Sequence, residues 1–494
     1  MRCILQTRRD YCKRKSRHYA KLQRMPCLYY VLSYESHSTR TGGQKMTDKK
    51  RKAVIVGSGL GGLLTAASLA KDGWQVDVYE RLSLIGGRFA NIEYKGYQLS
   101  TGALHMIPHG TNGPLATLLK ELGAEFEIVP SSPMAIVRMP KNREEKSYKN
   151  GYEDIHHTEF KKHLTSKNKR MMILLTLGFK FGIIRPGKIG FKTWYSKYIQ
   201  DDRIDRCADS FAGWALSTTA DEVTTKEIFE ILYNVVRYGG PGILVGGCQT
   251  AIDELVRIIS LYGGTVHTES EVTKIIVKEG EAKGVVVNNQ KIEADLVISD
   301  IGHKEAWELC DFDGVSCDSG SKILSLSFPA FKEYEEKLRD MKPSAGLKIC
   351  FSSDEQILPD GCSLMLTPYA RRINGLNEVT NADPNLAPPG KHLVMCHQRT
   401  ALDRLENIDE EIELGLSDLK DLFPDKNIDV LMIQVHHGRW PVNRAFSGTD
   451  FGNETPVLNL LVVGDGAKGE GGIEIEGIAL GVRKALKIIQ NRYK

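Results

Sequence analysis

The strongest hydrophobic pattern of this 494-residue chain lies in residues 53–80. Residues 53–56 are a short apolar run that ends at the glycine-rich stretch 57–62, and small or apolar side chains dominate 63–70. A short apolar run bounded by glycines predicts a buried strand, and the small side chains that follow predict a helix able to pack closely on a sheet. Residues 74–80 alternate between apolar and polar side chains, which predicts a second strand. The pattern therefore predicts one strand–helix–strand unit over 53–80.

The same type of pattern returns twice farther along the chain. Residues 238–259 place glycines before a helix-like segment, and residues 458–489 again read as a strand, a glycine loop and a helix. Between these units, residues 111–234 are rich in helix-like stretches and aromatic side chains, and residues 320–445 mix strand-like and helical pieces. A chain that returns three times to one kind of unit predicts a discontinuous domain with other material inserted into it.

We therefore predict an α/β protein (α+β overall) with a discontinuous Rossmann-like domain and an inserted substrate-binding domain of mixed sheet and helices. The expected Rossmann-like domain is composed of residues 51–110, 235–305 and 455–494. The expected substrate-binding domain is composed of residues 111–234 and 306–454. Residues 1–50 are expected to be a disordered basic extension outside both domains.

The first glycine loop has the spacing of a phosphate cradle. Gly57 permits the tight turn after the strand, Gly59 lets the backbone approach a pyrophosphate, and Gly62 lets helix and strand pack closely. The helix N-terminus then offers free N–H groups and a partial positive charge to the phosphates. Glu80 ends the second strand, 18 residues after Gly62, where its carboxylate can accept hydrogen bonds from ribose hydroxyls. Together these residues predict a dinucleotide-binding site.

The distribution of charge changes what the net charge of +4 implies. Residues 1–52 hold 15 Lys and Arg and 3 Asp and Glu, whereas the rest of the chain holds 51 basic and 59 acidic residues. The mildly acidic body predicts no nucleic-acid partner. The basic start reads either as a transit-peptide-like segment or as an upstream extension of a cytoplasmic protein that begins at Met46. We expect a cytoplasmic protein in which residues 1–45 are dispensable for cofactor binding.

Neither metal binding nor membrane spanning is predicted. Ten cysteines form no CxxC pair, and the histidines lack zinc-type spacing, so we expect no metal site and no disulfide framework. No apolar segment reaches the ~18–20 residues of a membrane-spanning helix. The nearest, residues 171–184, is flanked by cations between 167 and 192. It reads either as a surface for peripheral contact with an anionic membrane or as a buried cap helix.

Two further motifs resemble those of the amine-oxidase-like flavoproteins. The stretch ERLSLIGGRF at 80–89 is similar to the second glycine motif of monoamine oxidases, protoporphyrinogen oxidase, phytoene desaturases and Rab GDP-dissociation inhibitors. The stretch VVGDGAKGEGGIEIEGIALGVRKAL at 462–486 resembles the last motif of that superfamily, which brings a strand to the flavin side of the cofactor. The resemblance therefore implies FAD rather than a nicotinamide dinucleotide.

The resemblance also implies which residues hold the cofactor. Because no cysteine lies near the last motif, it implies non-covalent FAD. The implied cofactor-binding residues are Gly57, Ser58, Gly59, Leu60, Gly61, Gly62, Glu80, Arg81, Gly87, Arg88, Val272, Gly464, Asp465 and Ile473.

The substrate class follows from the middle of the chain. Residues 240–275 are most similar to the phytoene desaturase, carotenoid isomerase and retinol saturase branch. This implies an FAD-dependent oxidoreductase that acts on an apolar isoprenoid or polyene by hydride transfer, in desaturation, saturation or isomerisation. Two alternatives stay open: an amine- or protoporphyrinogen-oxidase-like enzyme, and a non-enzymatic prenyl-binding protein like the Rab GDP-dissociation inhibitors. The electron acceptor is not predicted.

Lys348 is the candidate catalytic residue. It lies in SAGLKICFSS, which is similar to the amine-oxidase strand whose lysine contacts a water near the flavin. The alternative is a lysine at a strand edge that faces solvent. Trp440, Pro441 and Phe446 precede the last predicted strand and would either wall the substrate pocket or pack in the core.

Overall fold

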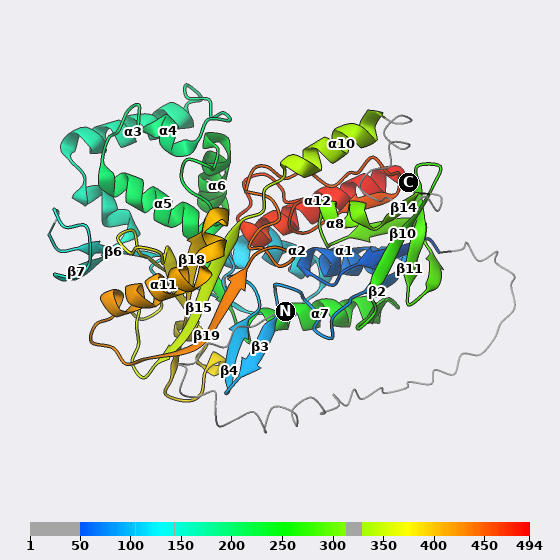
Figure 1. Cartoon of the computed structure of the whole chain (residues 1–494), viewed down its shortest axis with the longest axis horizontal. Helices are drawn as coiled ribbons and strands as arrows, with labels where there is room; N and C mark the ends of the chain where they lie inside the picture. The colour runs from blue at the N-terminus through cyan, green and yellow to red at the C-terminus, as the bar shows by residue number, and fades with distance from the viewer. Residues whose placement is uncertain (1–49, 104, 143, 313–328) are drawn as a thin grey trace, which may run out of the picture. The chain divides into compact units, whose positions relative to one another are not determined.

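The computed structural model describes residues 50–103, 105–142, 144–312 and 329–494 (Figure 1). The chain divides into two units at Lys50, and the architecture below is that of the second, Arg51–Lys494. The extension predicted for residues 1–50 lies almost wholly outside the described residues.

A five-stranded parallel sheet organises the first half of the fold, with strand order β20-β13-β1-β2-β9. Its strands are β1 (Lys52–Val56), β2 (Gln75–Tyr79), β9 (Thr265–His267), β13 (Leu296–Ser299) and β20 (Leu460–Val462). The sheet thus draws on three stretches of chain that are far apart in sequence. This discontinuous parallel sheet, together with the mixed sheets described below, confirms the predicted fold class.

Strand β1 is buried on both faces, which explains its uninterrupted apolar run. Ala53 and Ile55 pack with the helices on one side of the sheet. Val54 and Val56 pack on the other side, in the apolar cluster shared with a four-stranded sheet of order β12-β11-β10-β14. The strands of that second sheet are β10 (Val272–Lys278), β11 (Glu281–Val287), β12 (Gln290–Glu293) and β14 (Cys310–Phe312).

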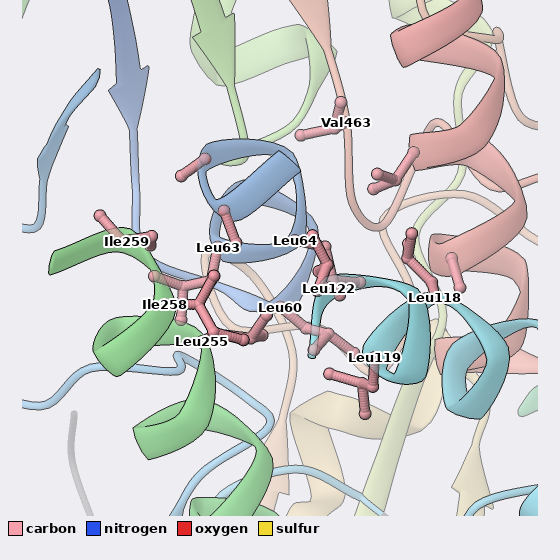
Figure 2. Close-up of a cluster of buried hydrophobic side chains, with 14 of the residues drawn as sticks. Leu60, Leu63, Leu64, Leu118, Leu119, Leu122, Leu255, Ile258, Ile259 and Val463 are labelled. Atoms are coloured by element: carbon pink, nitrogen blue, oxygen red, sulfur yellow. The ribbon is translucent and has the colours of Figure 1, made fainter. Parts of the chain in front are cut away.

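Helix α1 (Leu60–Lys71) is the centre of the helical layer. Eleven of its twelve residues are buried, because small and apolar side chains cover every face. Figure 2 shows Leu63 beside Leu255 and Ile258 on one side, and Leu64 beside Leu122 on the other. The helices around it are α2 (Pro114–Leu122), α7 (Cys248–Leu261) and α12 (Glu474–Arg492). The strand–helix–strand unit predicted for 53–80 is confirmed in β1, α1 and β2.

A seven-stranded mixed sheet forms the second half, with order β19-β15-β18-β17-β16-β6-β7. All nine residues of β15 are buried, because it pairs with β18 and β19 along its length. One face of this sheet packs under helix α11, and the other face packs with Leu99 and Met106. Its elements are β6 (Ile136–Pro140), β7 (Tyr152–His156), β15 (Ala345–Ser353), β16 (Met365–Leu366), β17 (Gly375–Glu378), β18 (His392–Thr400), β19 (Ile428–His436) and α11 (Ile408–Leu422).

Four helices between residues 166 and 238 form a separate layer (Figure 1). Thr165, Asp201 and Thr224 cap three of them, each accepting a hydrogen bond from a backbone N–H of the first turn. The helices are α3 (Ser166–Lys180), α4 (Phe191–Tyr195), α5 (Asp202–Leu216) and α6 (Thr225–Tyr238).

Shorter elements complete the described fold: β3 (Asn91–Tyr94), β4 (Tyr97–Ser100), β5 (Ile128–Pro130), β8 (Gly242–Leu244), α8 (His303–Glu308) and α10 (Pro329–Asp340). Strands β3 and β4 form a hairpin, and β5 pairs with β8. Among the helices of the described ranges, none is both long enough and apolar enough to cross a membrane.

Candidate cofactor-binding site

A cavity of about 370 Å³ opens at the carboxyl ends of the strands of the parallel sheet. Its wall includes Gly57 after β1, Glu80 after β2, Asp300 after β13 and Asp465 after β20. Open parallel sheets bind ligands at this edge, because the loops that follow neighbouring strands converge there. Val272, at the start of β10, also lines the cavity.

The first glycine loop fits closely between neighbouring chain segments. Gly57 has a φ of +93°, which favours glycine. A Cβ on Gly61 would lie 2.6 Å from the Cα of Gly464, so helix α1 approaches the loop after β20 as closely as backbone allows. No side chain caps the N-terminus of α1 at Gly59. Asp300 accepts from the N–H of Gly62, and the other N–H groups of this first turn remain for an anionic group at the cavity wall.

Glu80 joins this loop to the end of β2. Its side chain is buried, and Oε2 accepts hydrogen bonds from the backbone N–H and the hydroxyl of Ser58, both at 2.9 Å. Oε1 accepts from the N–H of Leu82 at 2.9 Å. A carboxylate has about four acceptor positions, so Glu80 retains capacity for a further donor. The carboxylate therefore both holds the loop and can bind a ribose hydroxyl.

Arg88 lies in the second glycine loop, which packs on the first. The N–H of Gly86 donates to the backbone oxygen of Ser58 at 2.9 Å. The Arg88 guanidinium donates to the backbone oxygens of Pro441 and Val442 at 2.6 and 2.7 Å, and to Asp465 at 2.7 Å. Arg88 is thus a cavity-lining cation that also ties together three distant parts of the chain.

Asp465 is the acceptor at the centre of a buried charge cluster. Besides Arg88, it accepts from Lys468 Nζ at 3.1 Å and from the backbone N–H of Arg444 at 2.7 Å. Burial by itself raises the pKa of this carboxyl, but the nearby Lys468 and Arg88 cations hold the pKa below its ordinary value. Asp465 is therefore ionised, and it stabilises the two cations beside the cavity.

Asp300 is a cavity residue that the sequence reasoning missed. Its carboxyl accepts a hydrogen bond from the N–H of Gly62, at the N-terminal turn of α1, and its Oδ2 has no hydrogen-bond partner among the described residues. Burial raises the pKa of Asp300 to about 7, although Gly62 and the cations Arg444 and Arg88 act in the opposite direction. The only sequence signal was an acidic residue directly after the strand-like stretch ADLVIS.

The structure places the other predicted cofactor residues at different depths. Gly59, Leu60, Gly61, Arg81 and Gly87 line the cavity. The remaining four do not line it. Ser58 donates to Glu80, and Ile473 lies in an apolar core. The two glycines serve close packing: a Cβ on Gly62 would lie 2.6 Å from the backbone oxygen of Gly57, and Gly464 packs against Gly61.

Lys348 lies in the middle of β15 and is fully buried, so the alternative of a solvent-facing lysine at a strand edge is wrong. Its ammonium donates to the Ser100 hydroxyl at 2.8 Å and to the backbone oxygens of Ser100 and Gly102. Gly102 lines the cavity. Burial, and then the Lys348 charge, lower the pKa of His105 to about 3, so that imidazole is neutral.

The second glycine-led helix does not provide a second phosphate cradle. The N–H of Gln249, in the first turn of α7, donates to the Asn91 side chain at 3.2 Å. The preceding Gly246 donates its N–H to Asp383 at 2.7 Å. These side chains occupy the donors that a phosphate would need. No cluster of potential metal ligands occurs among the described residues.

Comparison with known proteins agrees with the geometry of the site. The family model of flavin-containing amine oxidoreductases matches residues 60–477. The solved structure of an oxidoreductase from Methanosarcina mazei is 47% identical, with a TM-score of 0.83, over 88% of this chain and 100% of that chain. An uncharacterized protein of Methanocaldococcus jannaschii is 40% identical over 88% of this chain and 99% of its own length.

Two more distant relatives have names that refer to carotenoid chemistry. A chloroplastic prolycopene isomerase of Arabidopsis thaliana is 24% identical over 88% of this chain and 80% of its own length. A neurosporene-forming phytoene desaturase of Cereibacter sphaeroides is 25% identical over 51% of this chain and 53% of its own length.

Proposed function

The chain belongs to the flavin-containing amine oxidoreductase family, and on that premise we propose that it is an oxidoreductase that binds FAD non-covalently and acts on an apolar, polyene-type substrate. The observation that carries the proposal is the cavity at the carboxyl edge of the parallel sheet, where Glu80, Arg88 and Asp465 meet the glycine loop. The named carotenoid relatives support the substrate class. Neither an amine-oxidase-like activity nor a prenyl-binding role without enzyme activity is favoured.

The residues of the cavity fit the chemistry of FAD. The glycine loop brings backbone without side chains to the cavity wall, and the N–H groups in the first turn of α1 other than that of Gly62, which donates to Asp300, can donate to a diphosphate. Glu80 provides the ribose acceptor, and Arg88 provides a fixed cation. At another part of the wall, Met106 and Trp440 offer apolar surface that suits an aromatic ring and an apolar substrate.

Bound FAD would supply hydride transfer, as flavins do in their enzymes. The chain's own residues would orient the cofactor and the substrate and enclose the site. Lys348 holds the backbone at 100–102 against the seven-stranded sheet through three hydrogen bonds, and that backbone leads into the wall residues Gly102 and Met106. Because Lys348 is fully buried, does not itself line the cavity and binds the backbone that leads into its wall, we assign it as a positioning residue.

Acid precipitation is the direct test of the cofactor. We expect the purified chain to be yellow and to release all its flavin into the supernatant, because no cysteine lies near the last motif to form a thioether bond. The absorption spectrum and chromatography of the supernatant identify the flavin. A colourless chain that FAD does not reconstitute, or flavin that stays in the pellet, would contradict the proposal.

The affinity for FAD is expected to depend on pH through Asp300. Its carboxyl has a pKa raised to about 7, so it is neutral below that pH and becomes an anion above it, beside the donors of α1. An anion there repels the diphosphate, so the affinity of the unchanged protein should fall about tenfold from about pH 6 to about pH 8.

Asp300→Asn is the matched variant, because the amide oxygen can still accept from Gly62 but cannot become charged. Flavin titration, followed by fluorescence quenching, should show nearly constant affinity over the same pH range. If this variant keeps the full pH dependence, another group is responsible.

A further inference from the structure

Helix α3 exposes apolar side chains where a helix in water normally has polar ones. Met171, Leu175 and Phe179 recur at i, i+4 and i+8 on the partly buried face, and Phe179 stacks on Phe229 of α6 at 4.2 Å between ring centroids. The opposite face carries Ile173 and Leu177, which are 59% and 42% exposed. Both faces of α3 are therefore apolar, although only one is covered.

The exposed apolar surface continues past the end of α3. Phe181 and Ile183 are 70% and 78% exposed. Of the fifteen large apolar side chains that are exposed in the described residues, seven lie between 172 and 189. We call the surface of Ile173, Leu174, Leu177, Phe181 and Ile183 the α3 patch. A concentration of this kind on a soluble protein marks an interaction surface. Figure 1 shows α3 at the outer edge of the layer that it forms with α4, α5 and α6.

The charge around the α3 patch has one sign only. Residues 160–200 contain ten Lys and Arg and no Asp or Glu, whereas residues 53–494 as a whole carry more acidic than basic residues. Five of these cations flank the patch in sequence, and none of the five forms an ion pair within the described part of the chain: Lys167, Lys169, Arg170, Arg185 and Lys188. They are therefore free to meet anions outside the protein.

Three of these cations stand where they weaken the helix that carries them. Lys167, Lys169 and Arg170 lie in the first turns of α3, and the first turn has no acidic residue. The N-terminus of a helix carries partial positive charge, so cations there are unfavourable. Cations at an unfavourable helix position, beside an uncovered apolar face, indicate that these residues serve binding rather than folding.

From these observations we propose that the α3 patch inserts into the interfacial region of an anionic lipid bilayer, with the flanking cations on the lipid headgroups. Two contributions stabilise a protein on a membrane surface. Apolar side chains enter the headgroup–acyl boundary, and cations contact the anionic headgroups. The long stems of lysine and arginine can follow apolar surface while their charges stay at the interface. The proposal rests on surface chemistry and does not depend on the cofactor.

Vesicle flotation with the full chain tests it. We expect the chain to float with vesicles of phosphatidylcholine and phosphatidylserine, and to bind those of phosphatidylcholine alone much more weakly. Leu174→Asp with Leu177→Asp should weaken binding to the anionic vesicles by roughly 10- to 100-fold, because the apolar contribution is lost. Lys167→Gln, Lys169→Gln and Arg170→Gln together should weaken it by roughly 100-fold.

The matched control removes the same charge elsewhere: Lys278→Gln, Lys291→Gln and Lys487→Gln, at exposed lysines outside the patch. This variant should bind vesicles almost as the unchanged chain does. Residues 1–50 are identical in every variant, so their basic charge contributes equally to all. The far-ultraviolet circular dichroism spectrum reports whether each variant is folded.

Patch variants that bind anionic vesicles as tightly as the control variant would overturn the proposal. So would an unchanged chain that forms a dimer which Leu174→Asp with Leu177→Asp dissociates, because the patch would then be covered by a second copy. Loss of flavin colour with retained vesicle binding would count against the proposed function alone.

Discussion

Replacing Glu80 by alanine is expected to weaken FAD binding by on the order of 10- to 100-fold. The variant removes a charge-assisted hydrogen bond to the ribose that is worth roughly 1.5–3 kcal/mol, at about 1.4 kcal/mol per decade of affinity. It also removes the acceptor of three hydrogen bonds that hold Ser58 and Leu82, so the glycine loop loses its attachment to β2. Flavin titration of the apoprotein measures the effect.

Glu80→Gln should lose less affinity than Glu80→Ala, because the amide oxygen can still accept a hydrogen bond. Activity at saturating FAD should survive in both variants, since the ribose lies far from the reactive ring. Glu411→Ala is the matched control, because Glu411 is equally buried but pairs with Arg372 and does not line the cavity. It should lower stability without changing the affinity for FAD. Unchanged affinity in Glu80→Ala would remove Glu80 from the site.

The second large effect is expected on stability. Asp465→Asn should lower the free energy of unfolding of the apoprotein by about 3–5 kcal/mol, because it leaves the buried Lys468 and the partly buried Arg88 without their common anion. Urea denaturation measures the change. Asp311→Asn breaks the exposed pair with Lys274 and should cost less than about 1 kcal/mol.

The pH dependence of the Asp465 effect has a definite sign. The folded-state pKa of Asp465 lies below its ordinary value, so its stabilisation is fully present above the pKa of the unfolded carboxyl. As the pH falls toward the folded-state pKa, protonation removes that stabilisation, and the difference between the unchanged chain and Asp465→Asn should shrink. A difference that stays constant from neutral to acidic pH would contradict the charge-based explanation.

Local patterns were enough to predict the core of the candidate site. The strand–helix–strand unit over 53–80 depends on apolar runs and glycine turns between near neighbours, and the structure confirms it. The return of the chain near its end was also readable, because residues 458–489 repeat the strand, glycine loop and helix, and β20 joins the same sheet beside β13. The middle repeat at 238–259 behaves differently, since its strand β8 pairs with β5 outside that sheet.

A local pattern does not determine which groups a segment will meet. The glycines before α7 have the same appearance as those before α1, yet Asn91 and Asp383 occupy the donors of the α7 N-terminus. Lys348 looked equally suited to an exposed edge, but pairing of β15 on both sides buries it. Both outcomes depend on segments that lie elsewhere in the sequence.

The sequence by itself determined the strand–helix–strand unit over 53–80, with its glycine loop, and the fold class, because turn chemistry and hydrophobic periodicity act over a few residues. Only the tertiary structure decided that Arg88 meets Asp465 and Pro441, more than 350 residues away, and that Asp300 lies against the first turn of α1. Clusters of charged side chains and cavity walls form where distant segments converge, and burial shifts the pKa values of the groups that meet there. Folding of the whole chain is what brings these groups together.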